Sequence, residues 1–380
     1  MNINQNLEII FSIIAKHNIA FLIHPIQTIH SITMNILITI IIFIAVLLLY
    51  IYITSQFKKS EDLDIYEADY ISNKNLQEIC DVRQPVVFHL APFDPAIFDA
   101  DSILSTSGPL DVKIKDLNDY YAAEASTDAV TLPLTTAQKL MANDDAAHFL
   151  SENNDDFLEE SGLRKRVQLI DDFVKPSFSI QSKYDVLLAS PNATTPLRYH
   201  ENYRQFIAVS SGKIRVKMTP WKSTKYLHPV RDFENYEFYS PVHPTNPQPT
   251  YSKEFEKAKF LDFEVLPGYV LYVPPYWWYS VQFLEGPRLT VVYSVSYVTV
   301  MNFAANFPQY SMYWLQQQNI RKKISKTVPD VCLRELEEEK TADNVGEKKD
   351  DPNIEIIHLS DENATDEGVI VPPKKSESII

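Results

Sequence analysis

The chain has 380 residues, of which 45% are hydrophobic and 12% aromatic, so it is long enough to bury a full-sized core. Its formal net charge of −15 argues against a nucleic-acid-binding protein, because non-specific contact with phosphates requires a basic face. Its 2 cysteines lie far apart in the sequence, which argues against a disulfide framework and against a zinc site built from thiolates.

An uncharged apolar stretch at residues 36–53 predicts a transmembrane helix, which we place at residues 34–54. About 20 apolar residues suffice to cross a bilayer core, and Tyr50 and Tyr52 lie where interfacial aromatic side chains belong. A signal peptide would begin nearer the first residue and have a shorter apolar run, so we interpret the helix as a retained anchor. Lysine, histidine and proline interrupt the apolar stretch within residues 1–33, which we expect to form an interfacial helix or a short re-entrant piece rather than a second full span.

The charges on either side of the predicted helix indicate its orientation. Lys58 and Lys59 follow the helix, whereas only Lys16 precedes it. The positive-inside rule then places the large C-terminal part in the cytosol. Two glycosylation motifs, at Asn192 and Asn363, would be used only if that part faced the opposite side.

A short polar linker at residues 55–70 leads into a domain that we expect to span residues 71–330. The first half of this domain is expected to hold two strands and two helical segments, at residues 85–90, 112–115, 134–141 and 147–160. Thr135 or Thr136 is the expected N-cap of the first helical segment.

The second half of the domain has the pattern of a series of short β-strands. Its runs are rich in β-branched and aromatic residues, and turn signals such as Gly212 and Pro267–Gly268 separate them. Six strands are expected, at residues 206–210, 213–218, 260–265, 269–273, 278–283 and 289–297. Many short strands without long helices between them are typical of a barrel or a jelly roll.

Acidic residues crowd the end of the chain and aromatic residues are scarce there, so we expect residues 331–380 to be disordered. A basic run at residues 321–326 precedes this tail. It fits either a solvated helix end or a contact with anionic lipid, and the sequence leaves both interpretations open.

Two separated stretches carry a resemblance to a known family. They read Thr195-Pro-Leu-Arg-Tyr-His200 and, from Leu266, a Pro-Gly turn followed by a strand and Pro-Pro-Tyr-Trp-Trp. They resemble the cupin-like family related to JmjC proteins, which are iron- and 2-oxoglutarate-dependent hydroxylases and their relatives, over most of residues 71–300. The resemblance implies a mainly β fold with flanking helices (α+β), a double-stranded β-helix barrel of the cupin or jelly-roll type, preceded here by the transmembrane helix.

The resemblance also implies where a metal site would lie. In active relatives a His-x-Asp pair on one strand and a distal histidine form a facial triad that holds Fe(II). The matching positions here are Arg198, His200 and Tyr279. A guanidinium has no lone pair to donate, a phenol ionises only near pH 10, and one histidine is a poor iron site by itself. We therefore expect no metal, no cofactor and no catalytic residue, with these three positions left as a pocket.

The cosubstrate anchor is incomplete by the same comparison. Ile214 lies two residues after Gly212, where many relatives have a lysine for 2-oxoglutarate. Lys213 would point to the other face of its strand, whereas Thr195 matches a hydroxyl near the cosubstrate. Four residues stay as candidates for ligand binding: Thr195, Arg204, Lys213 and Trp278.

An anion is one alternative occupant of the pocket. Arg198 and Arg204 together fit a carboxylate or a phosphate, because arginine binds both through paired hydrogen bonds. A structural ion pair between Arg198 and Glu201, or another nearby acid, explains the same residues and is the interpretation that we favour.

Zinc and a protein partner are two further alternatives. His200 with His228 and His243 has the residue types of a zinc site, although histidines so widely spaced are more often unrelated. The aromatic residues around Trp278 fit either the core or a rim at which a peptide or protein binds.

The sequence thus predicts a membrane-anchored, single-pass cupin-like protein that is catalytically inactive and acts as a protein-binding or structural module. The alternative is an oxygenase of the protein hydroxylase or demethylase type that uses Fe(II) and 2-oxoglutarate with an atypical ligand set. An anchor, such a domain and an acidic tail are together similar to cupin-like proteins of large DNA viruses, where the domain would face a virion interior. The expected partners are the membrane and a protein or peptide at the barrel mouth.

Overall fold

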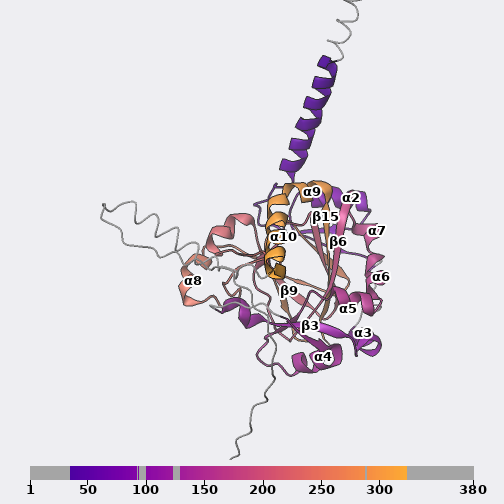
Figure 1. Ribbon diagram of the computed structural model, residues 1–380. Helices are drawn as coiled ribbons and strands as arrows, with labels where there is room; N and C mark the ends of the chain where they lie inside the picture. The colour runs from indigo at the N-terminus through magenta and orange to yellow at the C-terminus, as the bar shows by residue number, and fades with distance from the viewer. Residues whose placement is uncertain (1–34, 92, 94–99, 123–128, 287–288, 323–380) are drawn as a thin grey trace, which may run out of the picture. The chain divides into compact units, whose positions relative to one another are not determined.

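The computed structural model describes residues 35–91, 93, 100–122, 129–286 and 289–322, which Figure 1 draws in colour. These residues fall within one unit of the chain, Met1–Thr327. The predictions for residues 1–33, for the motif at Asn363 and for the tail at residues 331–380 lie outside the described residues.

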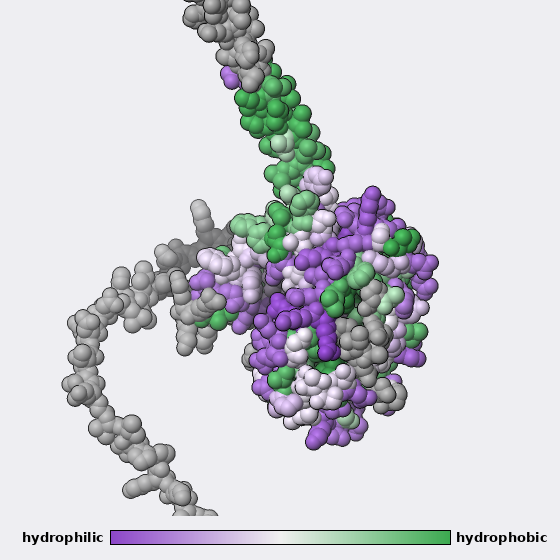
Figure 2. Space-filling model, turned by 90° about the vertical axis from the view of Figure 1, so that its right-hand side faces the viewer, coloured by the Kyte–Doolittle hydropathy of each residue, from purple (hydrophilic) through white to green (hydrophobic). Residues whose placement is uncertain are grey.

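The apolar stretch forms one continuous helix, Asn35–Ser55. Nearly all of its side chains are exposed, and Figure 2 shows them as a largely hydrophobic surface. By length and composition its 21 residues suffice to cross a membrane. The predicted helix is therefore confirmed, and its insertion into a membrane stays a proposal.

Nine strands form the larger of two sheets, in the order β1-β2-β13-β8-β15-β6-β5-β3-β4. Neighbouring strands run antiparallel except β1 and β2, which run parallel. The strands are β1 Tyr66–Asp69, β2 Val86–His89, β3 Asp111–Asp116, β4 Val130–Pro133, β5 Phe149–Ser151, β6 Ser179–Ala189, β8 Arg204–Ser211, β13 Tyr269–Val273 and β15 Val291–Thr299.

Six strands form the smaller sheet, in the order β10-β11-β7-β14-β9-β12, and all neighbours run antiparallel. They are β7 Arg198–Tyr199, β9 Ile214–Thr219, β10 Val230–Asp232, β11 Glu237–Tyr239, β12 Leu261–Val265 and β14 Trp278–Phe283. Between β6 and β15 the chain crosses to the other sheet at every connection except those from β9 to β12, where it stays in the smaller sheet and β10 and β11 form an inserted hairpin. This alternation is that of a double-stranded β-helix, so the predicted mainly β barrel with flanking helices is confirmed.

Short helices cover the outer face of the larger sheet. In Figure 1, α2, α5, α6 and α7 lie along the side on which β6 and β15 are labelled. The described helices are α2 Asn73–Cys80, α3 Ala100–Ser107, α4 Leu134–Ala142, α5 Asp155–Glu160, α6 Leu163–Gln168, α7 Asp171–Val174, α8 Pro249–Phe255, α9 Val300–Ala305 and α10 Phe307–Lys322, with 3₁₀ helices η2 Leu117–Tyr121 and η3 Trp221–Tyr226.

Strand alternation decides which side chains meet the helices and which face the barrel interior. On β15, Tyr293 and Val295 join the helices in one apolar cluster, whereas Val292 belongs to the cluster inside the barrel. A third cluster lies on the outer face of the smaller sheet and includes Tyr199 and Trp278. The barrel interior is therefore the middle layer of the domain.

The predicted strands and the helix at residues 134–141 are confirmed. The segment expected to be helical at residues 147–160 contains strand β5, and only its last part, α5, is helical. Strands β4, β7, β10 and β11 are absent from the prediction, and further details need correction. β6 is missing from the prediction, because its first half has polar and exposed side chains. β1 lies inside the predicted linker at residues 55–70 and extends the sheet next to β2. Helix α4 is capped at Pro133 without a side-chain hydrogen bond, so Thr135 and Thr136 are not its N-cap.

Gly212 forms the corner at which the chain passes from β8 to β9 and changes sheet. Its φ of +73° lies in the left-handed region, and a Cβ atom added there would lie 2.1 Å from Oγ1 of Thr290. The same Cβ would lie 2.9 Å from Cα of Thr290, so a simple side-chain rotation cannot remove the overlap. Both conformation and space therefore require glycine at this corner.

We expect Gly212→Ala to lower the free energy of unfolding by about 3 kcal/mol or more, because left-handed strain and overlap add together. Gly162→Ala is the matched control, since Gly162 has a φ of +71° but no atom within 4 Å of an added Cβ. The control should lose only about 1 kcal/mol from backbone strain. Urea unfolding of the full chain in detergent, followed by tryptophan fluorescence, measures both, and equal losses would contradict the overlap.

Candidate functional site

A cavity of about 160 Å³ lies inside the barrel, between the two sheets. The side chains that line it come mainly from β6, β7, β8, β14 and β15, and from the segments around Glu152 and Glu237. Its polar lining includes Lys183, Asp185 and Gln205.

Arg198, His200 and Tyr279 all line this cavity, as the sequence predicts. Arg198 on β7 is paired in register with Tyr279 on β14. The ring centroids of His200 and Tyr279 are 6.2 Å apart, and the Arg198 guanidinium carbon is 5.7 Å from the Tyr279 ring centroid. The three positions that match the metal ligands of active relatives therefore converge on one place.

The Arg198 guanidinium is neutralised by Glu152, with 2.6 Å between Nη1 and Oε2. The two side chains are 16% and 4% exposed, so this is a buried ion pair. Lys115 lies 3.2 Å from the other oxygen of Glu152 and 2.9 Å from Glu237. Tyr120 donates a hydrogen bond of 2.8 Å to Glu237. Two cations and two carboxylates thus form one closed network beside the cavity.

The network holds its members in their charged forms. Burial alone would raise the pKa of Glu152, but the charges of Arg198 and Lys115 outweigh it and lower the pKa to about 2. Burial also opposes the charge on Arg198, and Glu152 reverses this effect and raises the pKa of Arg198 well above its ordinary value. Arg198 is therefore a permanent cation at the first ligand position.

His200 is a neutral imidazole with one lone pair available. Its Nε2 lies 3.0 Å from the carbonyl oxygen of Val273, which can only accept, so Nε2 carries the proton and donates. Its Nδ1 is buried and makes no hydrogen bond of ordinary geometry. Burial lowers the pKa of His200 to about 3, so the ring stays uncharged at neutral pH.

Tyr279 stays a neutral phenol. Its hydroxyl accepts a hydrogen bond of 2.9 Å from Nε2 of Gln205. Burial raises the pKa of Tyr279, which makes a phenolate ligand less accessible than in water.

These side chains do not fit an Fe(II) ion. One neutral imidazole nitrogen, one neutral phenol and one guanidinium do not make the two-histidine, one-carboxylate set that holds iron in this kind of site. Among the residues that the structure describes, no three histidine, cysteine, aspartate or glutamate side chains lie close enough to share a metal ion. The carboxylate nearest to the ligand positions, Glu152, is already bound to Arg198 and Lys115.

The four other candidate ligand-binding residues lie away from the cavity. Oγ1 of Thr195 accepts a hydrogen bond from the backbone N–H of Val281. Trp278 is fully buried in the cluster outside the smaller sheet rather than at the barrel mouth. Lys213 is exposed, which agrees with the face predicted for it. None of them is therefore a pocket residue in the described chain.

Arg204 needs a separate account, because one alternative had it share an anion with Arg198. It lies on β8 next to Gln205, and alternation turns it away from the cavity that Gln205 lines. Its Nη1 donates to the carbonyl oxygen of Val174 on the helix-covered side. The predicted ion pair of Arg198 exists, but its partner is Glu152 rather than Glu201.

The histidines proposed for zinc are bound elsewhere. Nε2 of His228 lies 2.8 Å from Glu254, and the His243 ring lies 4.8 Å from that of Tyr121. The carboxylates and the lysine of the network were not predicted from the sequence, because Glu152 is 46 residues from Arg198. The only available signal was physical: a buried arginine requires an acid nearby.

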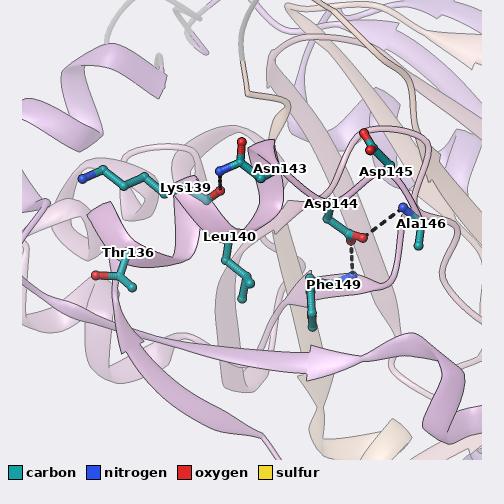
Figure 3. A pocket seen from close by; sticks show the side chains of 8 residues that line it. All are labelled: Thr136, Lys139, Leu140, Asn143, Asp144, Asp145, Ala146 and Phe149. Carbon is teal, nitrogen blue, oxygen red and sulfur yellow. Dashed lines mark hydrogen bonds between the residues drawn. The ribbon is translucent and has the colours of Figure 1, made fainter.

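A second hollow lies on the surface beside α4 and the segment that follows it (Figure 3). Its carboxylate Asp144 accepts hydrogen bonds from the backbone N–H groups of Ala146, His148 and Phe149. Asn143 donates to the carbonyl oxygen of Lys139. These hydrogen bonds stabilise the turn after helix α4. The polar groups of this hollow therefore serve the local backbone structure.

Comparison with known proteins agrees with this geometry. Residues 109–350 match the family described as "Cupin-like domain". The chain is also similar to proteins named HSPB1-associated protein 1 from Rattus norvegicus and Mus musculus, at 28% identity over 105 residues, and from Homo sapiens, at 27%. These matches cover 27% of this chain and span 22% of the length of those relatives.

We expect Glu152→Gln to lower the free energy of unfolding by about 3 kcal/mol or more, because it leaves the charges of Arg198 and Lys115 incompletely neutralised inside the protein. Asp156→Asn is the matched control, since it breaks an exposed pair in which Lys113 and Asp156 lie 3.1 Å apart. The control should change the stability by about 0.5 kcal/mol or less. Urea unfolding at neutral pH measures both variants, and a Glu152→Gln protein as stable as the control would contradict a buried network.

Proposed function

This chain belongs to the cupin-like family related to JmjC-type oxygenases, and we propose that it is a member without iron chemistry. Its role would be that of a membrane-anchored protein-binding or structural module. The observation that carries the proposal is Arg198, which occupies a position where active relatives hold a metal and is paired with Glu152 at 2.6 Å. A permanent cation there repels a metal ion and donates no electron pair to it.

Binding is the function that a cupin-like barrel retains without a metal. Tyr236, from the β10–β11 hairpin, lines the cavity and is half-buried, so it offers an aromatic ring to a peptide or protein. The similar proteins named HSPB1-associated protein 1 carry an association with another protein in their name, which supports the same kind of role here. Fe(II) and 2-oxoglutarate belong to the alternative, an oxygenase with an atypical ligand set.

Membrane anchoring is the second part of the proposal. The helix Asn35–Ser55 leaves its apolar side chains without partners in the domain, and a bilayer would bury them. Lys58 and Lys59 follow this helix directly, which favours a cytosolic domain by the positive-inside rule. A domain in a virion interior would have the same orientation as a cytosolic domain. The likeness of this chain to proteins of large DNA viruses stays a prediction.

We expect the full chain, purified in detergent, to bind no stoichiometric Fe(II) and to show no 2-oxoglutarate decarboxylation. A variant with Arg198→His, His200→Asp and Tyr279→His should gain metal affinity, with Glu152→Gln added because Glu152 would otherwise lose its partner. Anaerobic titration with Fe(II) should give a Kd at least about a hundredfold tighter for this variant than for the wild-type chain.

Glu152→Gln alone is the control for the metal experiment, because it opens the network without supplying ligands. Stoichiometric iron with turnover in the wild-type chain would overturn the proposal and support the oxygenase alternative. Equal weak binding by all three proteins would show that the barrel does not keep the geometry of a metal site.

We expect the full chain to stay with the membrane during alkaline carbonate extraction, because its helix would be buried in lipid. A chain that lacks residues 35–55 should be released, and its stability in solution is the control for correct folding. Asn192 is exposed and should remain unglycosylated in a eukaryotic host, since the domain would face the cytosol. Release of the full chain would contradict the anchor, and glycosylation at Asn192 would contradict the orientation.

A further inference from the structure

Lys59, which follows the apolar helix, inserts its ammonium group between two aromatic rings of the domain. Its Nζ lies 3.8 Å from the ring centroid of Trp221 and 4.4 Å from that of Tyr276. The two rings meet at 79°, with 5.5 Å between their centroids, so they form two walls of a corner. An ammonium group over the faces of two aromatic rings is the arrangement that recognises lysine and its methylated forms.

Glu201 lies beside the same corner, since its backbone carbonyl oxygen accepts a hydrogen bond of 3.3 Å from Asn306, which in turn accepts one from the Tyr276 hydroxyl. The Glu201 side chain is buried. Burial lowers the pKa of Lys59, and the charge of Glu201 opposes this shift. Burial raises the pKa of Glu201 itself to about 7, and Tyr236, Arg231 and Lys59 oppose this shift. In its ionised form, this buried carboxylate next to two aromatic walls favours a cation over a neutral side chain.

The corner is held in place independently of Lys59. The Tyr276 hydroxyl donates a hydrogen bond of 3.0 Å to Oδ1 of Asn306, and the Tyr276 N–H donates one of 2.9 Å to the carbonyl oxygen of His200. Tyr276 has a φ of +65°, a left-handed conformation that a bulky residue rarely adopts. Trp221 packs against Tyr199 at 5.0 Å between ring centroids. A strained residue fixed by two hydrogen bonds is typical of a binding site that is formed in advance.

The residues after Lys59 are bound to the domain as well. Nζ of Lys222 donates a hydrogen bond of 2.6 Å to the backbone carbonyl oxygen of Glu61. Lys58, by contrast, is exposed. Of the two adjacent lysines, Lys59 is bound to the domain and Lys58 lies in solvent. The contact therefore depends on the position of the lysine in the chain and not only on its charge.

We propose that Trp221, Tyr276 and Glu201 form an ammonium-binding cage for lysine side chains, which Lys59 of the same chain occupies. Occupation of the cage fastens the segment after the helix to the domain. The proposal goes beyond the function proposed above, since none of the three cage residues lines the barrel cavity. The contacts of Lys59 with the cage would persist whether or not the barrel cavity bound a metal. One proposal can therefore be wrong while the other holds.

Hydrogen exchange of the full chain in nanodiscs tests the occupation by Lys59. We expect Lys59→Gln and Lys59→Met to speed amide exchange at residues 57–63 by about tenfold, because they remove the cation from the cage. Lys59→Arg should change it much less, since it keeps the charge, and Lys58→Gln is the matched control that should change nothing. Unchanged exchange in Lys59→Gln, or equal changes in the Lys58 and Lys59 variants, would overturn the proposal.

A peptide tests whether the cage binds an ammonium group that is not part of the chain. The probe is a fluorescent peptide with the sequence of residues 55–63, added to the Lys59→Gln protein and followed by anisotropy. It should bind at least about tenfold more tightly than the same peptide with glutamine in place of Lys59, and both peptides keep Lys58. Equal affinity of the two peptides would show that the rings only pack against the chain, which overturns a lysine site.

Discussion

A buried guanidinium has to be neutralised close by, and this requirement organises the interior of the barrel. Arg198 comes from a core strand, while its partner Glu152 follows β5 and the neighbouring Lys115 and Glu237 come from β3 and β11. None of these three partners belongs to the strands that alternate between the two sheets. The charges therefore bind the peripheral segments to the barrel, and a change at any of the four residues leaves an opposite charge buried without its partner.

The sequence allowed the barrel to be predicted, because strand alternation and Pro-Gly turns are local patterns. It also identified Arg198, His200 and Tyr279 as neighbours, through the likeness of two motifs to a family. The partner of Arg198 was not predictable in this way, since Glu152 lies 46 residues away in a segment with no strong pattern of its own. Contacts between distant segments depend on register and loop paths, which local periodicity does not specify.

Arg204 shows a different kind of limit. Its position beside Gln205 on a strand already implied that only one of the two could face the interior. Which of them faced inward depended on the register of β8 against β13 and β15, and the sequence did not fix that register. When the register of a strand shifts by one residue, the side chains that faced the interior face outward and the others turn inward. Arg204 was therefore grouped with Arg198, although it contacts Val174 on the other side of the sheet.

The inner cavity and the lysine-occupied corner are close in the sequence but are formed by different residues. His200 lines the cavity, whereas the next residue, Glu201, faces the corner formed by Trp221 and Tyr276. A backbone hydrogen bond, from Tyr276 to the carbonyl oxygen of His200, links the two places. The same short stretch can therefore lose metal ligands on one side while it keeps a binding surface on the other.

The connection between helix and domain limits how far the domain can travel. The helix ends at Ser55 and β1 begins at Tyr66, and the roughly 10 residues between them span at most about 35 Å when fully extended. With the helix in a bilayer, the domain would be confined to a thin layer beside the lipid surface. Binding partners embedded in the same membrane would then meet it at a raised effective concentration, so that even weak contacts would be populated, whereas freely diffusing partners would gain nothing.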